Sequence, residues 1–243
     1  RQMWIGGRRA TAGGGSSEEL DVLQIDLSDK SSLQRGARTF VNYCLSCHSA
    51  AYMRYERMAA DLDINDQLLR ENLMFAASKP GELMTVTMSD EGAKDWFGVV
   101  PPDLSLTARS HGSDWIYTYM RSFYRDDSTV TGWNNLLFPN VAMPHVLYRW
   151  QGTRDARFEE QDGVQEFVGF EDRALGELSP DEYDAAVRDL TNFMVYLAEP
   201  AKLVRYKIGF WVMVFMGILI LLSYALKREY LRGRNCKKIV LLK

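Results

Sequence analysis

The sequence predicts an all-α globular domain with long loops, followed by one transmembrane helix near the C-terminal end. Three observations support this fold class. Apolar residues recur at helical spacing in segments that begin near Ser31 and near Ser179. No stretch alternates strongly enough between apolar and polar residues to predict a sheet. A run of 19 residues without a charge, 208–226, follows the second helical segment.

The first predicted helix runs from about Ser31 into the segment around Cys44, with Asp29 or Ser31 as its N-terminal cap. Gly36 lies in the interior of this helix, where a glycine costs about 1 kcal/mol relative to alanine. We therefore expect another helix to cross closely at Gly36.

Three later segments predict further helices. The patterns at 66–77 and 114–124 favour two short ones. The clearest signal is Ser179 followed by Pro180 and Glu182, which is typical of a capping box with proline at the first helical position. The apolar stripe of this helix comprises Val187, Leu190, Met194 and Leu197, and Pro200 ends it.

The uncharged run 208–226 predicts a membrane anchor. At about 1.5 Å per residue its helix is roughly 28 Å long, close to the roughly 30 Å of a hydrocarbon core. Trp211 and Tyr224 lie one turn inside its ends, where interfacial aromatic residues are common. A wholly buried core helix is the alternative, but the rest of the chain is too short to enclose one. We assign 205–227 to the anchor.

Charge is distributed unevenly along the 243 residues. Residues 201–243 contain ten basic residues and one acid, a net of +9, whereas the preceding 200 residues contain 19 basic and 31 acidic residues, a net of −12. An acidic body repels nucleic acid and attracts basic partners. The composition, 47% hydrophobic and 25% charged, excludes disordered and collagen-like proteins.

The positive-inside rule orients the anchor. Basic residues are more numerous after the anchor than before it, so the tail, 228–243, is expected to be cytoplasmic. The domain 21–204 is then on the periplasmic side of a bacterial inner membrane, or in the intermembrane space of a mitochondrion. Residues 1–20 lack the apolar core of a signal peptide and are expected to form a flexible leader.

The chemistry is expected at two of the three cysteines. Cys236 follows the anchor and cannot pair with Cys44 or Cys47 across the membrane. The remaining pair forms Cys44-Leu45-Ser46-Cys47-His48, the C-x-x-C-H pattern of covalent c-type haem attachment. Two thioethers hold the porphyrin in this pattern, and the adjoining histidine is thereby presented to the iron.

Two other readings of the motif remain open. A zinc site needs a second Cys or His pair, and the other two histidines, His111 and His145, do not have that spacing. A thioredoxin-like dithiol follows a strand, whereas the residues before Cys44 have a helical pattern.

Met143 is the expected sixth ligand of the iron. It lies in the segment 138–144, where Pro139 and Pro144 restrict the loop, and it follows His48 by 95 residues. His145 is the competing candidate. A methionine ligand occupies the open iron position, which favours electron transfer over peroxidase or sensor chemistry.

These features in this order resemble the cytochrome c1 family, in its bacterial form. The resemblance covers about 21–231 and rests on GARTF at 36–40, CLSCH at 44–48, Tyr52 with RYER at 54–57, WFG at 96–98, PPDLS at 101–105, FPNVAMP at 138–144, AEP at 198–200 and KREY at 227–230.

The resemblance implies a class I cytochrome c-like haem domain with one haem c. Cys44 and Cys47 would bind the haem, and His48 and Met143 would ligate its iron. Pro102 would line the pocket. A basic side chain would reach a haem propionate; Arg109 is favoured over His111, because a guanidinium gives the stronger charge-assisted bond. Trp115 would lie near the propionates, or alternatively would be an ordinary core aromatic residue.

The resemblance also implies the partners and the function. The chain would accept one electron from a Rieske iron–sulfur protein and pass it to a soluble basic cytochrome c. It would do so within the dimeric quinol:cytochrome c reductase, with cytochrome b beside its anchor and no substrate chemistry of its own. A membrane-tethered cytochrome c shuttle for another dehydrogenase or oxidase is the alternative. The segment 155–184, with eleven carboxylates and two arginines, is either a solvated loop or the docking surface.

Overall fold

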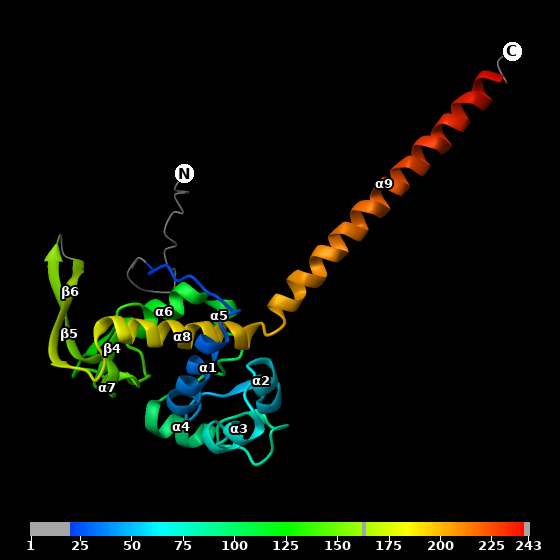
Figure 1. Cartoon of the computed structure of the whole chain (residues 1–243). Coiled ribbons are helices and arrows are strands. Elements are labelled where there is room, and N and C mark those ends of the chain that lie inside the picture. Colours follow the sequence, from blue (N-terminus) through cyan, green and yellow to red (C-terminus); the bar gives the residue numbers. More distant parts are fainter. Residues whose placement is uncertain (1–19, 162–163, 241–243) are drawn as a thin grey trace. The chain divides into compact units, whose positions relative to one another are not determined.

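The computed structural model describes residues 20–161 and 164–240 (Figure 1). The expected leader, apart from Leu20, lies outside the described residues, as do residues 241–243 of the expected tail. The chain divides into two compact units, Arg1–Glu199 and Pro200–Lys243. The first unit contains all the candidate site residues, and the second contains the expected anchor.

The described part of the first unit is mainly helical. Its helices are α1 (Lys30–Thr39), the π-helix η1 (Phe40–Cys44), α2 (Tyr55–Asp61), α3 (Asp66–Asn72), α4 (Asp90–Phe97), α5 (Thr107–Ser110), α6 (Ser113–Arg121), α7 (Tyr148–Gln151) and α8 (Pro180–Ala198). Its strands are β1 (Ala50–Arg54), β2 (Leu83–Met84), β3 (Phe123–Arg125), β4 (Trp133–Asn135), β5 (Gly152–Gln161) and β6 (Val164–Leu175).

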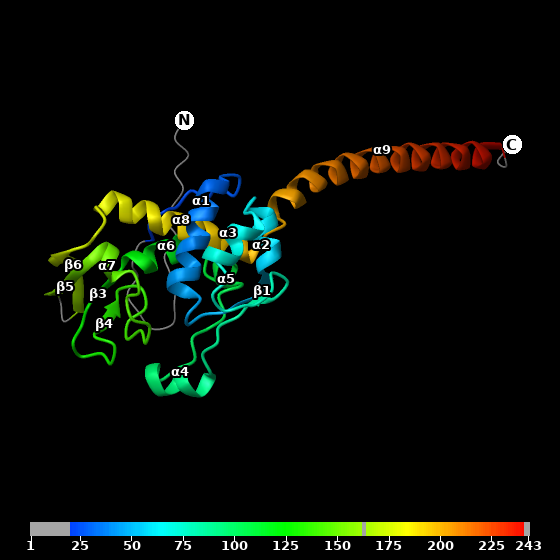
Figure 2. The same cartoon turned by 60° about the horizontal axis from the view of Figure 1, so that its bottom comes forward.

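The expectation of an all-α fold is confirmed only in part, because the described residues also form strands. The strands form three antiparallel pairs, β1–β2, β3–β4 and β5–β6. In both views β3 to β6 gather at one end of the unit, and α2 and α3 lie at the other (Figures 1 and 2). The longest pair, β5–β6, lies within and around the acidic segment 155–184. Its side chains between 153 and 160 and between 165 and 175 are exposed or half-buried, so no buried face produces the apolar alternation that identifies a strand.

The crossing of α1 and α8 confirms the prediction made from Gly36. A Cβ atom on Gly36 would lie 2.1 Å from the backbone oxygen of Asp189 on α8, so only glycine fits there. Asp29 is the N-terminal cap of α1, because its side chain accepts a hydrogen bond from the backbone N–H of Ser32. The close crossing buries Phe40 against Phe193, with ring centroids 5.5 Å apart.

Helix α8 begins with the predicted capping box. The Ser179 hydroxyl accepts from the N–H of Glu182, and the Glu182 carboxylate accepts from the N–H of Ser179. The predicted apolar stripe, Val187, Leu190, Met194 and Leu197, is buried. The two shorter predicted helices end earlier than expected: α3 stops at Asn72, and α6 stops at Arg121 because Phe123–Arg125 pairs with β4 instead.

The second unit consists mainly of α9 (Lys202–Val240). Its segment Lys202–Arg232 is long and apolar enough to cross a membrane, with a mean hydropathy of 2.3 over its most apolar window. The helix thus extends beyond both ends of the expected anchor, 205–227, because the flanking basic residues also favour helix.

Candidate functional site

The C-x-x-C-H segment begins where a helix changes its winding. Helix α1 continues into the single turn of π-helix η1, in which the N–H of Leu45 donates to the carbonyl of Phe40. Such turns recur at functional sites because they displace side chains from the regular helical surface. The next turn is closed by the N–H groups of Cys47 and His48, which both donate to the carbonyl of Cys44, at 3.1 and 2.8 Å. The three residues of the motif are therefore fixed on one compact turn.

Cys44 and Cys47 form no disulfide. Cys44 is buried, and Cys47 is half-buried. Burial, with a smaller contribution from Cys47, raises the pKa of the Cys44 thiol to about 12. Among the described residues, no group of three or more His, Cys, Asp and Glu side chains has the arrangement of a metal site. This favours thioether formation by the thiols over the zinc reading.

His48 is oriented by Pro102. Its Nδ1 atom lies 2.7 Å from the Pro102 carbonyl oxygen. Because a carbonyl oxygen can only accept, Nδ1 must carry the proton, and the lone pair is then on Nε2. Burial lowers the pKa of His48, although the bond to Pro102 and the charge of Asp103 oppose this shift. The imidazole is thus neutral and in the tautomer that a metal ligand requires.

Asp103 holds the Pro102 segment in place. Its two carboxylate oxygens accept from the backbone N–H groups of Ala51 and Ser105, each at 2.8 Å. The N–H of Leu104 also donates to the carbonyl of Ser49. The segment after Pro102 therefore runs along the residues that follow the haem motif, which fixes the carbonyl that orients His48.

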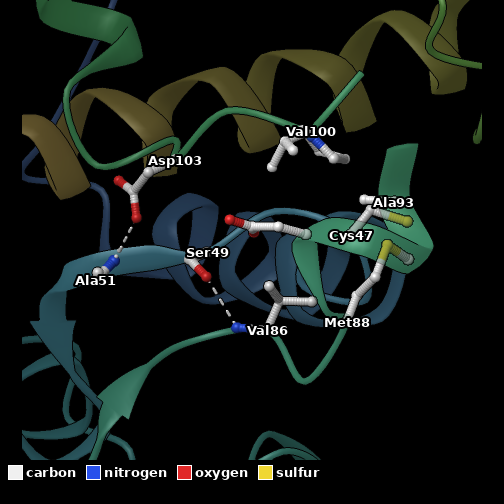
Figure 3. A pocket seen from close by; sticks show the side chains of 10 residues that line it. Cys47, Ser49, Ala51, Val86, Met88, Ala93, Val100 and Asp103 are labelled. Carbon is white, nitrogen blue, oxygen red and sulfur yellow. Dashed lines mark hydrogen bonds between the residues drawn. The ribbon is translucent and has the colours of Figure 1, made fainter. Parts of the chain in front are cut away.

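A cavity of about 210 Å³ adjoins the motif (Figure 3). Cys47 lines it together with apolar side chains from α4 and from the loops on either side of α4, among them Val86, Met88, Ala93 and Val100. One wall is fixed by the bonds from Ala51 to Asp103 and from Val86 to Ser49 that Figure 3 shows. Ser49, Asp90 and Asp103 add polar groups to the lining, so the cavity beside Cys47 combines apolar walls with a few polar groups, as is typical of cofactor sites.

Met143 lies beside an aromatic stack on α6. The Tyr119 hydroxyl donates to the Met143 sulfur at 3.5 Å. Tyr119 stacks on Trp115 at 4.9 Å between ring centroids, and Trp115 stacks on His111 at 4.4 Å. His111, Trp115 and Tyr119 follow one another at intervals of four residues. Trp115 and Tyr119 therefore lie on one face of α6, and His111, just before the helix, continues that face.

Trp115 has an unpaired donor in this stack. Its indole N–H is buried and has no hydrogen-bond acceptor among the described residues. A buried N–H without an acceptor is costly, so an acceptor from a bound group would stabilise it. A carboxylate is such an acceptor, which fits a haem propionate. His111 stacks on this indole, whereas Arg109 is exposed on α5 and has no carboxylate partner within the described part of the chain.

Two asparagines shape the loop that carries Met143. The side-chain oxygen of Asn135, which is fully buried, accepts from the N–H groups of Leu137 and Phe138. The side-chain oxygen of Asn134 accepts from the N–H of Asn140, whose φ of 60° is in the left-handed region. The loop is therefore held by specific side-chain bonds in addition to its two prolines.

His145, the competing ligand, is enclosed by aromatic rings. It is 1% exposed, stacks on Phe123 at 4.8 Å and contacts the edge of Trp133 at 5.2 Å. Neither ring nitrogen has a hydrogen-bond partner of normal geometry in the described residues, and burial lowers its pKa to about 3. His145 is therefore a neutral member of an aromatic cluster.

The donor set fits haem c. Two thiols, a neutral imidazole with a free Nε2 atom, a thioether and an unpaired indole N–H are present, and Cys44 belongs to the hydrophobic core against which Trp115 and Met143 pack. Four residues of the site could not be recognised from the sequence: Asp103, Tyr119, Asn134 and Asn135. Only Tyr119 had a signal, its spacing of four residues from Trp115.

Comparison with known proteins agrees with this chemistry. The model of the Cytochrome C1 family matches residues 24–233. Cytochrome c1 of Allochromatium vinosum is 51% identical over 219 residues, which cover 89% of this chain and 90% of that protein. The ammonia monooxygenase gamma subunit of Nitrosomonas europaea is 45% identical over 218 residues, 90% of each chain.

More distant relatives are mitochondrial. The mitochondrial cytochrome c1-2 haem protein of Solanum tuberosum is 28% identical over 224 residues, 81% of this chain and 77% of that protein. The match therefore extends over both units, through nearly all of the described residues. The chain belongs to the cytochrome c1 family, the electron-transfer haem subunits of the cytochrome bc1 complex.

Proposed function

We propose that the chain accepts one electron from a Rieske iron–sulfur protein and delivers it to a soluble cytochrome c, as a subunit of quinol:cytochrome c reductase. The observation that carries the proposal is the hydrogen bond from His48 to Pro102, which leaves Nε2 of a motif histidine free for iron in a chain of the cytochrome c1 family. When bound, haem c supplies a one-electron iron couple.

The chain's own residues hold the cofactor in this proposal. Cys44 and Cys47 would hold the haem through thioethers, and His48 and Met143 would ligate its iron. Trp115 donates its indole N–H to a propionate, and Arg109 or His111 supplies a positive or polar contact beside it. The Trp115–Tyr119 stack and the hydrophobic core against which Met143 packs would limit access of water and of other ligands to the metal, which supports a high potential.

The acidic β5–β6 hairpin is the proposed docking surface for the acceptor. Within it Arg173 pairs with Asp155, and Arg157 lies 4.0 Å from Glu171. Glu159, Glu160 and Glu166 are exposed and belong to none of these pairs. An excess of exposed carboxylates raises the encounter rate with a basic cytochrome c, and salt screens this effect.

The second unit is the proposed membrane anchor, and its charges determine the proposed orientation in the membrane. Helix α9 spans the bilayer, the basic tail 228–243 is cytoplasmic, and the haem unit is periplasmic at a bacterial inner membrane. Gly209 and Gly217 on α9 allow another helix to approach closely, and we propose cytochrome b as that neighbour within a dimeric complex.

An optical experiment tests the proposal. The full chain is purified gently from its own membranes, and spectra are recorded before and after addition of a reduced quinol. We expect both b-type and c-type haem bands, with the c-type band reduced through a route that quinol-site inhibitors block. A c-type band alone, unresponsive to quinol, would instead support the tethered shuttle, and the lack of any covalent haem would overturn both.

A further inference from the structure

We propose that Tyr119 is the positioning residue for the sixth iron ligand, because its hydroxyl donates a hydrogen bond to the Met143 sulfur. The inference rests on the proposed haem ligation by Met143. It assigns to Tyr119 an effect on the redox potential and on the retention of the methionine ligand.

The contact itself has the right chemistry. The Tyr119 hydroxyl lies 3.5 Å from the Met143 sulfur. A thioether sulfur is a weak acceptor with two lone pairs, so one can accept this bond while the other remains available to a metal. No other hydrogen bond of this hydroxyl is found within the described residues. The bond therefore fixes the sulfur without competing for its role as a ligand.

The Tyr119 ring is immobilised by its neighbours. It stacks on Trp115 with an interplanar angle of 10°, and the Phe123 ring meets it edge-on at 5.1 Å and 74°. Aromatic pairs of this kind contribute about 0.5–1.5 kcal/mol beyond the area they bury. A ring held in this way delivers its hydroxyl to one place, as a group that positions a metal ligand must.

The backbone of Tyr119 is tied to the loop of Met143. The side-chain amide of Asn135 donates to the Tyr119 carbonyl at 2.8 Å, and its oxygen accepts from the N–H groups of Leu137 and Phe138. One buried side chain thus fixes α6 relative to the loop that carries Met143. The distance from hydroxyl to sulfur is consequently determined by the fold, and it does not depend on a chance surface contact.

The hydrogen bond has two consequences, one for the electronic properties of the iron and one for the rate at which the sulfur leaves it. It withdraws electron density from the sulfur, so the sulfur donates less to the iron. Ferric iron loses more stabilisation than ferrous iron, and the reduction potential rises. It also resists departure of the sulfur, because a departing methionine would leave a buried hydroxyl without a partner. Replacement of the hydroxyl should affect both properties and leave the aromatic packing in place.

The test compares Tyr119→Phe with Tyr117→Phe in the full-length holoprotein. Tyr117 is on the same helix, but its ring lies under the Arg121 guanidinium at 4.7 Å. We expect Tyr119→Phe to lower the ratio of ferrous to ferric protein at a given applied potential by about threefold. At ~59 mV per tenfold change, this corresponds to a midpoint potential lower by roughly 28 mV. The ferric form of this variant should bind imidazole at least threefold more tightly, while Tyr117→Phe should match the wild type in both measurements.

The outcomes separate the inference from the proposed function. One outcome overturns the inference alone: the wild type shows the ferric sulfur-to-iron charge-transfer band, but Tyr119→Phe has the potential and the imidazole affinity of the wild type. A wild type without that band, and with a spectrum unaffected by Met143→Leu, overturns the proposed ligation itself. If Tyr119→Phe does not retain haem, 3-fluorotyrosine at position 119, which donates more strongly, must raise the potential; an unchanged or lower value again overturns the inference.

Discussion

The Nδ1 atom of His48 and the carbonyl oxygen of Pro102, 54 residues apart in the sequence, are joined by a hydrogen bond of 2.7 Å. This bond depends on Asp103, whose carboxylate accepts the N–H groups of Ala51 and Ser105. The orientation of His48, the proposed iron ligand, thus depends on the Asp103 carboxylate, although neither of these two bonds of Asp103 involves the imidazole or the motif cysteines.

Asp103→Ala is expected to loosen the His48 ligand. Two backbone N–H groups lose their acceptor, which lowers the free energy of unfolding by about 1–2 kcal/mol. The imidazole is then less firmly oriented, and the high-spin fraction of the ferric holoprotein rises. Thermal unfolding and the ferric optical spectrum measure both effects. Asp66→Ala is the control: it removes an exposed pair with Arg70 and one acidic residue from the first turn of α3, both far weaker contributions, and should change neither measurement appreciably.

Asn135→Ala is expected to destabilise the loop that carries Met143, and to lower the free energy of unfolding more than Asp103→Ala does. The substitution leaves the N–H groups of Leu137 and Phe138 without their acceptor. It also removes one of the two donors to the Tyr119 carbonyl, which keeps the N–H of Ser122. For a fully buried side chain this costs about 2–3 kcal/mol, and the sulfur-to-iron charge-transfer band should weaken with the loop. Denaturant unfolding together with that band tests the prediction. A destabilised protein with an intact band would show that the loop does not depend on Asn135.

Gly36→Ala is expected to separate α1 from α8. The new Cβ atom would lie 2.1 Å from the Asp189 backbone oxygen, so the two helices must move apart, at a cost of about 3 kcal/mol. Thermal unfolding measures the loss. Gly81→Ala is the matched control, because a Cβ atom there would meet the Glu56 carboxylate at an ordinary 3.6 Å. Similar melting temperatures for the two variants would contradict the predicted crossing.

The parts of the fold that sequence predicts are those with local signals. Asp29, Gly36 and the Ser179 capping box specify where α1 and α8 begin and cross, since each acts on its own backbone or on one neighbour. The β5–β6 hairpin has no comparable signal. Its described side chains are exposed or half-buried, so its register depends on backbone pairing that leaves no apolar period in the sequence.

The candidate site shows the same division. Cys44, Cys47 and His48 are identifiable because their chemistry is confined to five adjacent residues. The groups that orient the proposed ligands are Asp103, Tyr119 and Asn135. They act across loops and helices through one to three hydrogen bonds each. Nothing in the spacing of Asp103 or Asn135 distinguishes them from ordinary turn residues, and only tertiary structure brings them to the site.

The capping box of α8 predicts a specific pH dependence. Hydrogen bonds from the N–H and the hydroxyl of Ser179 lower the pKa of Glu182. A carboxyl group whose pKa is lower in the folded chain contributes stability above its unfolded pKa and loses it as the pH falls through the folded value. The melting temperature of the wild type should therefore exceed that of Glu182→Gln at about pH 6 and approach it toward about pH 3. A difference independent of pH would contradict the prediction.

Reversal of the hairpin charges is expected to slow delivery of electrons to a basic cytochrome c. In a variant with Glu159, Glu160 and Glu166 changed to lysine, the exposed surface changes by six charges, so attraction becomes repulsion. The second-order rate at low ionic strength should fall by about tenfold or more, and the difference should largely disappear near 1 M salt, where the screening length is ~3 Å. Rapid-mixing kinetics measure both. The corresponding change of Glu56, Asp66 and Glu71, exposed carboxylates elsewhere on the unit, carries the same net charge change and is the control. Equal slowing by the two variants would mean that total charge, rather than the hairpin, directs the encounter.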